Sequence, residues 1–305
     1  MPAIINTNIT SLNAQRSTSA SQMSLTTSMQ RLSSGLRVNS AKDDAAGLAI
    51  AERMNAQVRG MNVAMRNAND GISMAQVGEG ALGKVSDIFQ RMRELAVQSA
   101  NGTNSAADRV SLNQEYVQLA QEATRTLGGT QFNGLNILAT TDASTFQIGA
   151  NNTTNLDRIT VGAFDWKSTS NAGITDVLGT AVLSGTDVGS YNAGTSTYTA
   201  GTDGPTNLIT DVNGALAAVT NLDAAINSVN SQRATFGAIQ NRFENVVANL
   251  QVAAENQSAA RARIMDADYA TETSNLSRAN ILQQAGNAMV AQANQLPQMV
   301  LSLLK

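Results

Sequence analysis

A heptad repeat between Met54 and Phe89 is the feature that most constrains the fold of this chain. Apolar or small residues recur there at alternating steps of four and three, with Glu79 and Ser86 as interruptions. The repeat consists of Met54, Val58, Met61, Met65, Ala68, Ile72, Ala75, Leu82 and Phe89. A period of about 3.5 residues describes one narrow apolar seam on a long helix, as in a left-handed coiled coil. Because such a helix is about 50 Å long, it requires a partner of similar length.

A second heptad repeat, near the other end of the sequence, supplies that partner. Its positions stand seven apart, and six of the seven are apolar. They are Leu222, Val229, Phe236, Phe243, Leu250, Gln257 and Ile264. Because the two seams match in period, we expect their helices to pack against each other. The sequence therefore predicts a mainly α fold, a long antiparallel coiled-coil rod formed by paired N- and C-terminal segments.

Weaker amphipathic patterns extend to both ends of the chain. Residues 3–37 have poor helix propensity between two apolar patches, so they should be helical only when packed against a partner. Residues 269–305 end in an apolar run, which is costly to expose in a monomer. We expect the two segments to be buried against each other and against further copies of the chain. The residues expected to make these contacts are Ile5, Ile9, Leu12, Leu32, Leu36, Leu296, Val300, Leu301, Leu303 and Leu304.

Turn and strand signals fill the region between the seams. A helix capped by Ser105 and Asp108 follows the first long helix and forms an αα-hairpin with it. Asn133-Gly134 indicates a hairpin turn, and short runs of β-branched residues up to residue 164 predict a small β-rich excursion. Pro205 then fits the first turn of the second long helix.

Breaks in the helical pattern divide the chain into three predicted parts. Residues 1–40 and 269–305 form a terminal coiled-coil layer, and residues 41–164 and 205–268 form a helical domain with the β-hairpin. Residues 165–204, rich in Thr, Ser, Gly and Asn, form a small solvent-facing insert. At the first break, Ser40 and Asp43 have the outline of a helix cap. A cap is favoured over acid catalysis or metal binding because the chain has no His and no third ligand is nearby.

The composition excludes several classes of function. The chain has no Cys and no His, which removes catalytic thiols, disulfides, Cys/His zinc sites and histidine acid–base chemistry. A net charge of −3 indicates neither nucleic acid nor anionic membrane as a partner. No window is long and apolar enough to span a membrane, and the N-terminus lacks the pattern of a secretory signal peptide. We expect no enzymatic activity, no metal and no cofactor.

Specific strings at both ends of the chain resemble those of bacterial flagellins. At the N-terminal end they are INTNITSLNAQ, QRLSSGLRVNSAKDDAAGLAIAERM, QRMRELAVQSANGTNS and TQFNG. At the C-terminal end they are FENVVANLQVAAENQSAARARIMDADYATE, ILQQAGNAMVAQANQ and LSLLK. The resemblance covers residues 1–150 and 206–305. It implies a structural subunit that polymerises into a hollow helical filament, the propeller for motility, with the terminal segments innermost and the middle facing solvent.

The resemblance also implies partners and a location. It implies unfolded export through the flagellar type III apparatus without a cleaved signal, an extracellular filament of identical copies, an export chaperone on the C-terminal segment, and hook-associated junction and cap proteins. The string from Gln90 to Leu95 is similar to the surface that Toll-like receptor 5 recognises. Carried over residue by residue, the anchors are Arg91, Leu95 and Glu115, with Gln90 and Gln98 beside them. The alternative is that an exposed Arg and Leu on a packed helix simply serve a contact between subunits, and receptor recognition is the preferred interpretation.

Other functions stay open at this point. A junction protein between hook and filament shares the terminal helices, although the full set of strings favours flagellin itself. An enzyme carried on the filament would need an H-E-x-x-H zinc helix, which a chain without His cannot supply. The middle could bind a ligand through Trp166, Tyr191 and Tyr198 or carry O-glycans on its Ser and Thr residues. A small satellite core around the three aromatic residues is the preferred interpretation.

Overall fold

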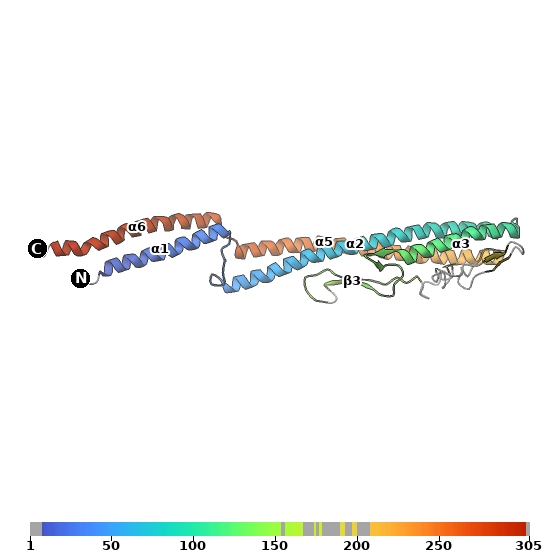
Figure 1. Cartoon of the computed structure of the whole chain (residues 1–305), viewed down its shortest axis with the longest axis horizontal. Coiled ribbons are helices and arrows are strands. Elements are labelled where there is room, and N and C mark those ends of the chain that lie inside the picture. The colour runs from blue at the N-terminus through green and yellow to red at the C-terminus, as the bar shows by residue number, and fades with distance from the viewer. Residues whose placement is uncertain are drawn as a thin grey trace. The chain divides into compact units, whose positions relative to one another are not determined.

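Long helices dominate the computed structural model, which describes residues 8–153, 156–166, 174, 177–178, 190–192, 197–199 and 208–302. The helices are α1 (Ile9–Ser34), α2 (Ala45–Ala100), α3 (Ala106–Gly129), α5 (Val212–Met265) and α6 (Tyr269–Ser302) (Figure 1). The antiparallel strand pairs are β1 (Gln131–Phe132) with β2 (Leu135–Asn136), β3 (Ser144–Gln147) with β4 (Arg158–Val161), and β5 (Ser190–Asn192) with β6 (Thr197–Thr199). The predicted mainly α fold with a small β-rich excursion in the middle is confirmed.

The chain divides into two compact units. Met1–Arg59 and Ala253–Lys305 form one, here called the terminal unit, and Gly60–Val252 form the other, the central unit. The helix breaks lie where the sequence predicts them, but the units divide inside α2 and α5 and not at the predicted positions 40 and 268. The first turns of α2 and the last turns of α5 belong to the terminal unit because they share a core with the breaks. Val38, Ala51 and Met265 are buried together there.

The two helix breaks of the terminal unit are hydrogen-bonded to each other. The Arg37 amide donates to the Met265 carbonyl at 2.6 Å, and the Ala267 amide donates to the Gly35 carbonyl at 2.9 Å. Gly35 ends α1 in the left-handed region at φ 72°, a conformation that glycine adopts without steric cost. The chain therefore turns at both breaks through one shared set of backbone contacts.

Carboxylates cap the helices that follow turns. The predicted capping box of α3 is confirmed, because the Ser105 and Asp108 side chains each accept from the other's backbone amide. At α2 the cap is Asp44, which directly precedes the helix, and not the predicted Ser40. Asp43 accepts from the Ser40 amide at 2.9 Å and closes the preceding turn, whereas Asp44 accepts from the Gly47 amide at 2.8 Å.

Phenylalanine rings packed on glycines form the centre of the α2–α5 seam. Phe236 and Phe243 are 1% and 0% exposed. A Cβ added to Gly71 would lie 2.7 Å from Phe243 Cζ, and one added to Gly78 would lie 3.0 Å from Phe236 Cε2. The glycines and the phenylalanines are each seven residues apart and pair in opposite order. The two helices, which lie side by side in Figure 1, are therefore antiparallel and in heptad register.

The β3–β4 hairpin is fastened to this seam. Phe146 of β3 meets Phe243 edge-to-face, with ring centroids 5.5 Å apart and ring planes at 82°. Asn67 Nδ2 on α2 donates to the Gln147 carbonyl at 2.9 Å. Ile159, which faces Phe146 in the strand register, is 1% exposed. The hairpin thus extends the core of the central unit.

The predicted turn at Asn133-Gly134 is confirmed. It joins β1 to β2, and its residues have φ values of 50° and 78°. A two-residue hairpin of this kind requires positive φ at both positions, which Asn and Gly tolerate best.

The chain returns to the helices through a buried loop before α5. Ile209 is 0% exposed. Its amide donates to Asn113 Oδ1 at 3.1 Å, and its carbonyl accepts from the Ser99 hydroxyl. Helix α5 begins only at Val212, with Asp211 accepting from the Gly214 amide at 2.8 Å. The prediction that Pro205 lies in the first turn of this helix is therefore wrong, and Pro205 itself lies outside the described residues.

Most of the predicted insert at residues 165–204 lies outside the described residues. Its described part belongs to the central unit. Trp166 is 0% exposed and is part of the main core, together with Ile174, Val177 and Leu178. Trp166 is therefore not part of a separate satellite core. The backbone of Tyr191 pairs with that of Tyr198 in the β5–β6 register.

The glycine–phenylalanine seam predicts opposite effects for two glycine substitutions in α2. Gly71→Ala should lower the free energy of unfolding by about 1–3 kcal/mol, because the new methyl group overlaps the Phe243 ring. Gly80→Ala should raise it by about 0.5–1 kcal/mol, because nothing lies within 4 Å of an added Cβ and alanine favours a helix. Urea denaturation of the monomer, followed by circular dichroism, measures both. Equal stability of the two variants would contradict this packing.

Candidate functional site

The α1–α6 pair of the terminal unit has an inner face of small and polar residues. Positions that are buried or half-buried follow alternating steps of three and four on both helices. On α1 they are Ser11, Ala14, Thr18, Ser21, Leu25, Ser28 and Leu32, and on α6 they are Glu272, Leu276, Ala279, Gln283, Gly286, Val290 and Ala293. The helices approach closely, since a Cβ added to Gly286 would lie 2.7 Å from Thr18 Oγ1. The pair is a coiled coil whose seam holds few large side chains.

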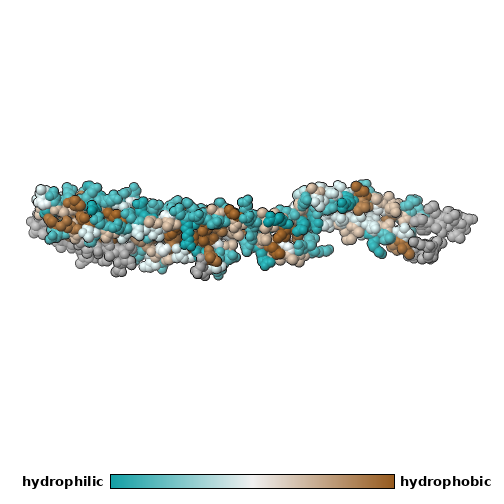
Figure 2. Space-filling view, turned by 180° about the vertical axis from the view of Figure 1, so that it is seen from behind, coloured by the Kyte–Doolittle hydropathy of each residue, from teal (hydrophilic) through white to brown (hydrophobic). Residues whose placement is uncertain are grey.

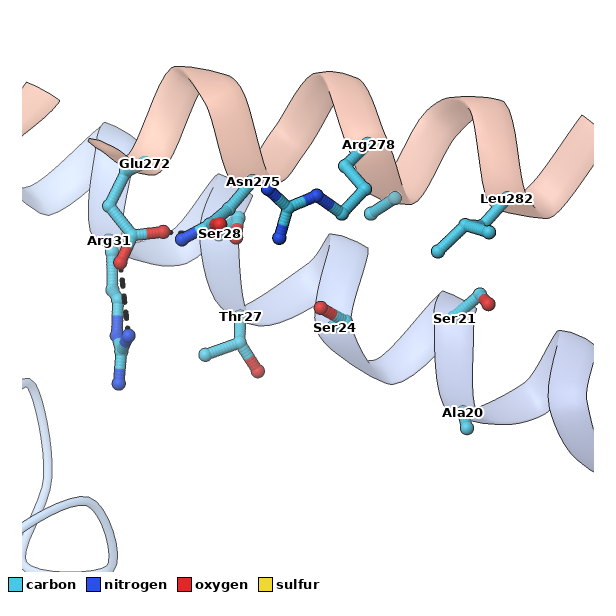
Figure 3. Close-up of a pocket in the computed structure, with 11 residues that line it drawn as sticks. Ala20, Ser21, Ser24, Thr27, Ser28, Arg31, Glu272, Asn275, Arg278 and Leu282 are labelled. Atoms are coloured by element: carbon cyan, nitrogen blue, oxygen red, sulfur yellow. Dashed lines mark hydrogen bonds and ion pairs between the residues drawn. The ribbon is translucent and has the colours of Figure 1, made fainter. Parts of the chain in front are cut away.

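Side-chain hydrogen bonds fix how α1 and α6 meet. At one end of the pair, Asn8 Nδ2 donates to the Ala293 carbonyl and the Ser11 hydroxyl donates to Asn294 Oδ1, both at 2.7 Å. At the other end, Glu272 accepts from the Ser28 hydroxyl and from Arg31 Nη1, both at 3.0 Å (Figure 3). Because a buried polar group is costly without its partner, these contacts favour one register of the two helices over others.

The Glu272 carboxylate is the most enclosed charge of this interface. Its side chain is 8% exposed and that of Arg31 is 31% exposed. Burial alone would raise the pKa of Glu272, but hydrogen bonds from Arg31 and Ser28 outweigh burial and hold the pKa below its ordinary value. A groove of about 570 Å³ lies beside the pair, lined by Ser and Thr hydroxyls of α1 and by Arg278 of α6 (Figure 3).

Many large apolar side chains of the terminal helices lie on the surface, whereas Leu25, Leu32, Leu276 and Val290 are half-buried in the seam. Each of seven such surface residues is at least half exposed. They are Ile9 at 63%, Leu12 at 53%, Met23 at 66%, Met29 at 56%, Ile281 at 66%, Leu282 at 50% and Met289 at 62%, and are called the terminal apolar residues below. Figure 2 shows hydrophobic side chains exposed on the α1–α6 pair. A compact soluble unit usually buries such side chains, so their exposure marks an interaction surface.

The structure places the predicted terminal contact residues in three groups. Ile9 and Leu12 are exposed. Leu32 lies half-buried in the α1–α6 seam, and Leu36 is half-buried in the small core at the helix breaks. Ile5, Leu303 and Leu304 lie outside the described residues, as do the side chains of Leu296, Val300 and Leu301, whose backbone belongs to α6. The predicted contact residues do not include the other terminal apolar residues, which are Met23, Met29, Ile281, Leu282 and Met289.

The predicted α2–α5 seam residues differ in burial along the two helices. Those near the α3 end of the central unit are fully buried, namely Leu82, Phe89, Leu222, Val229, Phe236 and Phe243. Those further along are half-buried, namely Met54, Val58, Met61, Met65, Ile72, Leu250 and Ile264. Gln257, the polar position of the second seam, donates a hydrogen bond to Gln57 in the terminal unit. The seam is enclosed where α3 also packs on α2 and where the β3–β4 hairpin covers Phe243, and elsewhere one partner helix leaves it partly open.

Arg91 presents its charge on the surface of the central unit. Its guanidinium donates to Glu94 Oε2 at 2.9 Å and to Glu115 Oε1 at 3.0 Å, and these hydrogen bonds raise the pKa of Arg91. Gln90 and Gln98 are exposed and line a shallow groove. Leu95, however, is 1% exposed and belongs to the core. The sequence placed Leu95 on this surface, and the structure corrects that placement.

The described residues include no group of three or more Asp and Glu side chains arranged to hold a metal ion. No helix in the described part of the chain is long and apolar enough to cross a membrane.

Comparison with known proteins finds matches at both ends of the chain. The model of the bacterial flagellin N-terminal helical region matches residues 5–143, and that of the C-terminal helical region matches residues 219–304. Flagellin D of Vibrio anguillarum is 38% identical over 376 aligned residues, with 100% of both chains covered. The flagellar filament 33 kDa core protein of Treponema phagedenis is 43% identical over 313 aligned residues, which cover 99% of this chain and 100% of that protein. Flagellin of Halalkalibacterium halodurans is 42% identical over 303 aligned residues, which cover 99% of this chain and 100% of that protein.

The position of Glu272 predicts an acid-sensitive contribution to stability. Because its pKa is lowered on folding, Glu272 stabilises the protein above the ordinary carboxyl pKa of about 4.5, and this contribution is lost as the pH falls through the lower folded-state pKa. Glu272→Gln should therefore cost about 1–3 kcal/mol at pH 7 and progressively less below about pH 4. Urea denaturation at a series of pH values measures the difference.

A matched control for this measurement is Glu52→Gln, which changes an exposed carboxylate of the same unit. This substitution should change the free energy of unfolding little at any pH of the series. A Glu272→Gln cost that stays constant down to pH 3 would show that the charge of Glu272 is not what stabilises the pair.

Proposed function

The chain belongs to the bacterial flagellin family and is a subunit of the flagellar filament, and we propose that the terminal apolar residues are the contacts through which its copies assemble. The observation that supports this is the inverted distribution of side chains on α1 and α6. Small and polar residues fill most of the seam between the helices, and the seven terminal apolar residues lie at the surface. Such an arrangement holds the pair in one register and leaves its hydrophobic area for other subunits.

The energetics favour a cooperative polymer over a dimer. A fully buried Leu, Ile or Met side chain contributes about 1.5–3 kcal/mol relative to an exposed one. The terminal apolar residues are spread over both helices, so one neighbour that covers one side leaves others exposed. Burying all of them takes several neighbours, as in a helical filament with the terminal pairs innermost. This layer would be apolar between subunits and hydrogen-bonded within each subunit.

Export and assembly partners follow from the same proposal. An exposed apolar C-terminal helix needs cover before assembly, which an export chaperone would supply in the cell. In the extracellular filament, junction proteins at the hook and a cap at the tip would contact the same helices. The protein would thus be secreted by the flagellar type III route and would act as a propeller subunit for motility. The alternative, a hook–filament junction protein, would use the same terminal contacts but form no long filaments.

Recognition of the free subunit by host Toll-like receptor 5 is supported by the geometry around Arg91. The side chains of Arg91 and Glu115 are 50% and 47% exposed. Ion pairs this exposed contribute little to stability because water screens them, so a partner can replace them at low cost. Gln90 and Gln98 add hydrogen-bonding groups nearby. Leu95 acts in this proposal by packing beneath the surface and not by contact with the receptor.

Assembly should fail when apolar contacts of the terminal helices are removed. The double variant Ile9→Asn, Ile281→Asn should raise the critical concentration for seeded polymerisation by about 100-fold or more, because two side chains no longer gain from burial. Sedimentation and electron microscopy measure the effect. Thr26→Asn with Gln284→Asn is the control, because it places asparagine at exposed polar positions of the same helices. Wild-type protein that stays monomeric with seeds would refute the proposed function.

Receptor signalling should depend on Arg91. Arg91→Ala should reduce the potency of the free subunit by about tenfold or more in a Toll-like receptor 5 reporter cell, since buried interface arginines often dominate binding. Arg125→Ala is the control, because Arg125 is also exposed and ion-paired, to Glu122 on α3. Unchanged signalling by Arg91→Ala would exclude this recognition mode while leaving the assembly proposal intact.

A further inference from the structure

The methionines differ in exposure according to their place in the fold. The sequence has 11 methionines and no cysteine, so methionine thioethers are its only sulfur atoms. Met23, Met29 and Met289 are 66%, 56% and 62% exposed. All three lie on α1 or α6. By contrast, the buried methionines Met74, Met92 and Met265 are 6%, 0% and 5% exposed.

Exposure decides which of these sulfur atoms an oxidant can reach. A thioether sulfur carries a lone pair that attacks the terminal oxygen of a hydroperoxide. An S–O bond forms as the O–O bond breaks, the sulfur is oxidised by two electrons, and the departing oxygen takes up a proton to leave as water or an alcohol. With no thiol in the chain to react first, the three exposed methionines are the most accessible targets among the described side chains.

We propose that Met23, Met29 and Met289 form an oxidation-sensitive modification site that controls assembly. Hydroperoxides convert them to methionine sulfoxides in the free subunit, and the modified subunit does not enter the polymer. This inference rests on the proposed function, because it takes the terminal apolar residues as the subunit contacts. Enzymatic reduction of the sulfoxides by methionine sulfoxide reductases returns the subunit to the assembling form.

The physical basis is the change in polarity at an interface built from apolar groups. A sulfoxide carries a strong hydrogen-bond acceptor, and burial of an acceptor without a donor is unfavourable. The other terminal apolar residues, Ile9, Leu12, Ile281 and Leu282, offer no side-chain donor. Within one subunit the oxidised side chains stay in water, so the fold itself is unaffected. The modification therefore acts on association and not on the stability of the subunit.

Peptide mapping tests the site itself. The monomeric full-length chain is exposed to hydrogen peroxide, and oxygen incorporation at each methionine is followed by mass spectrometry. We expect Met23, Met29 and Met289 to gain one oxygen at least about tenfold faster than Met74 and Met92, which the core shields. Equal rates at exposed and buried positions would overturn the assignment.

Seeded polymerisation tests the consequence. Oxidised wild-type protein should have a critical concentration at least about tenfold above that of untreated protein, and the two methionine sulfoxide reductases should reverse the change. The triple variant Met23→Leu, Met29→Leu, Met289→Leu, compared with its own untreated sample, should lose this sensitivity. A triple variant that remains sensitive would place the effect at another methionine and overturn the proposal.

The outcomes separate this inference from the function on which it rests. If untreated protein polymerises and oxidised protein polymerises equally well, the modification site is refuted and the filament function stands. If untreated protein does not polymerise with seeds, the filament function fails, and the proposed control of assembly fails with it. Circular dichroism of the oxidised monomer checks that α1 and α6 remain helical. A loss of helicity would show that oxidation acts on the fold, contrary to the proposal.

Discussion

Close packing of Phe236 and Phe243 on two glycines of α2 is the interaction on which the rest of the central unit depends. It brings two helices that are more than 100 residues apart in the chain into one antiparallel register. The β3–β4 hairpin then packs on the same Phe243 ring, and α3 encloses the neighbouring part of the seam. Because glycine leaves no side chain between the helices, a ring can fill the space fully, and neither partner can change size without a cavity or an overlap.

The α1–α6 pair of the terminal unit has the same heptad spacing but a seam of mainly small and polar side chains. Ser, Thr, Ala and Gly occupy more than half of its seam positions, and its specificity comes from hydrogen bonds such as those of Asn8, Ser11 and Glu272. Such a seam contributes little hydrophobic stabilisation. The large apolar side chains that lie on the surface of these helices remain available for contacts with other subunits. One chain thus contains a self-sufficient helix pair and a pair that completes its burial only by association, which suits the subunit of a filament.

The sequence revealed the residues of the seam that is made of large side chains. For the terminal pair it predicted the pairing but not the small and polar residues that form the seam. Val229, Phe236 and Phe243 stand out against a polar background because each buries a large apolar area, so their period alone located the central pairing. Ser11, Thr18 and Ser28 have the same period, but serine and threonine are equally common on exposed surfaces, and hydrophobicity does not separate the two uses. Leu95 was misplaced for another reason. Where α2 packs against both α3 and α5, its buried stripe is wider than one seam.

The loop at Ile209 decides how freely the middle of the chain can vary. Asn113 and Ser99 hold that loop by its backbone amide and carbonyl, a few residues before α5 begins. The starting point of α5 is thus fixed by α2 and α3 and not by the length of chain that precedes it. The alignment with the Vibrio anguillarum protein spans 376 positions against the 305 residues of this chain, so at least 71 of its positions have no counterpart here. A backbone anchor of this kind lets evolution lengthen or shorten an outer segment while the helices that assemble keep their register.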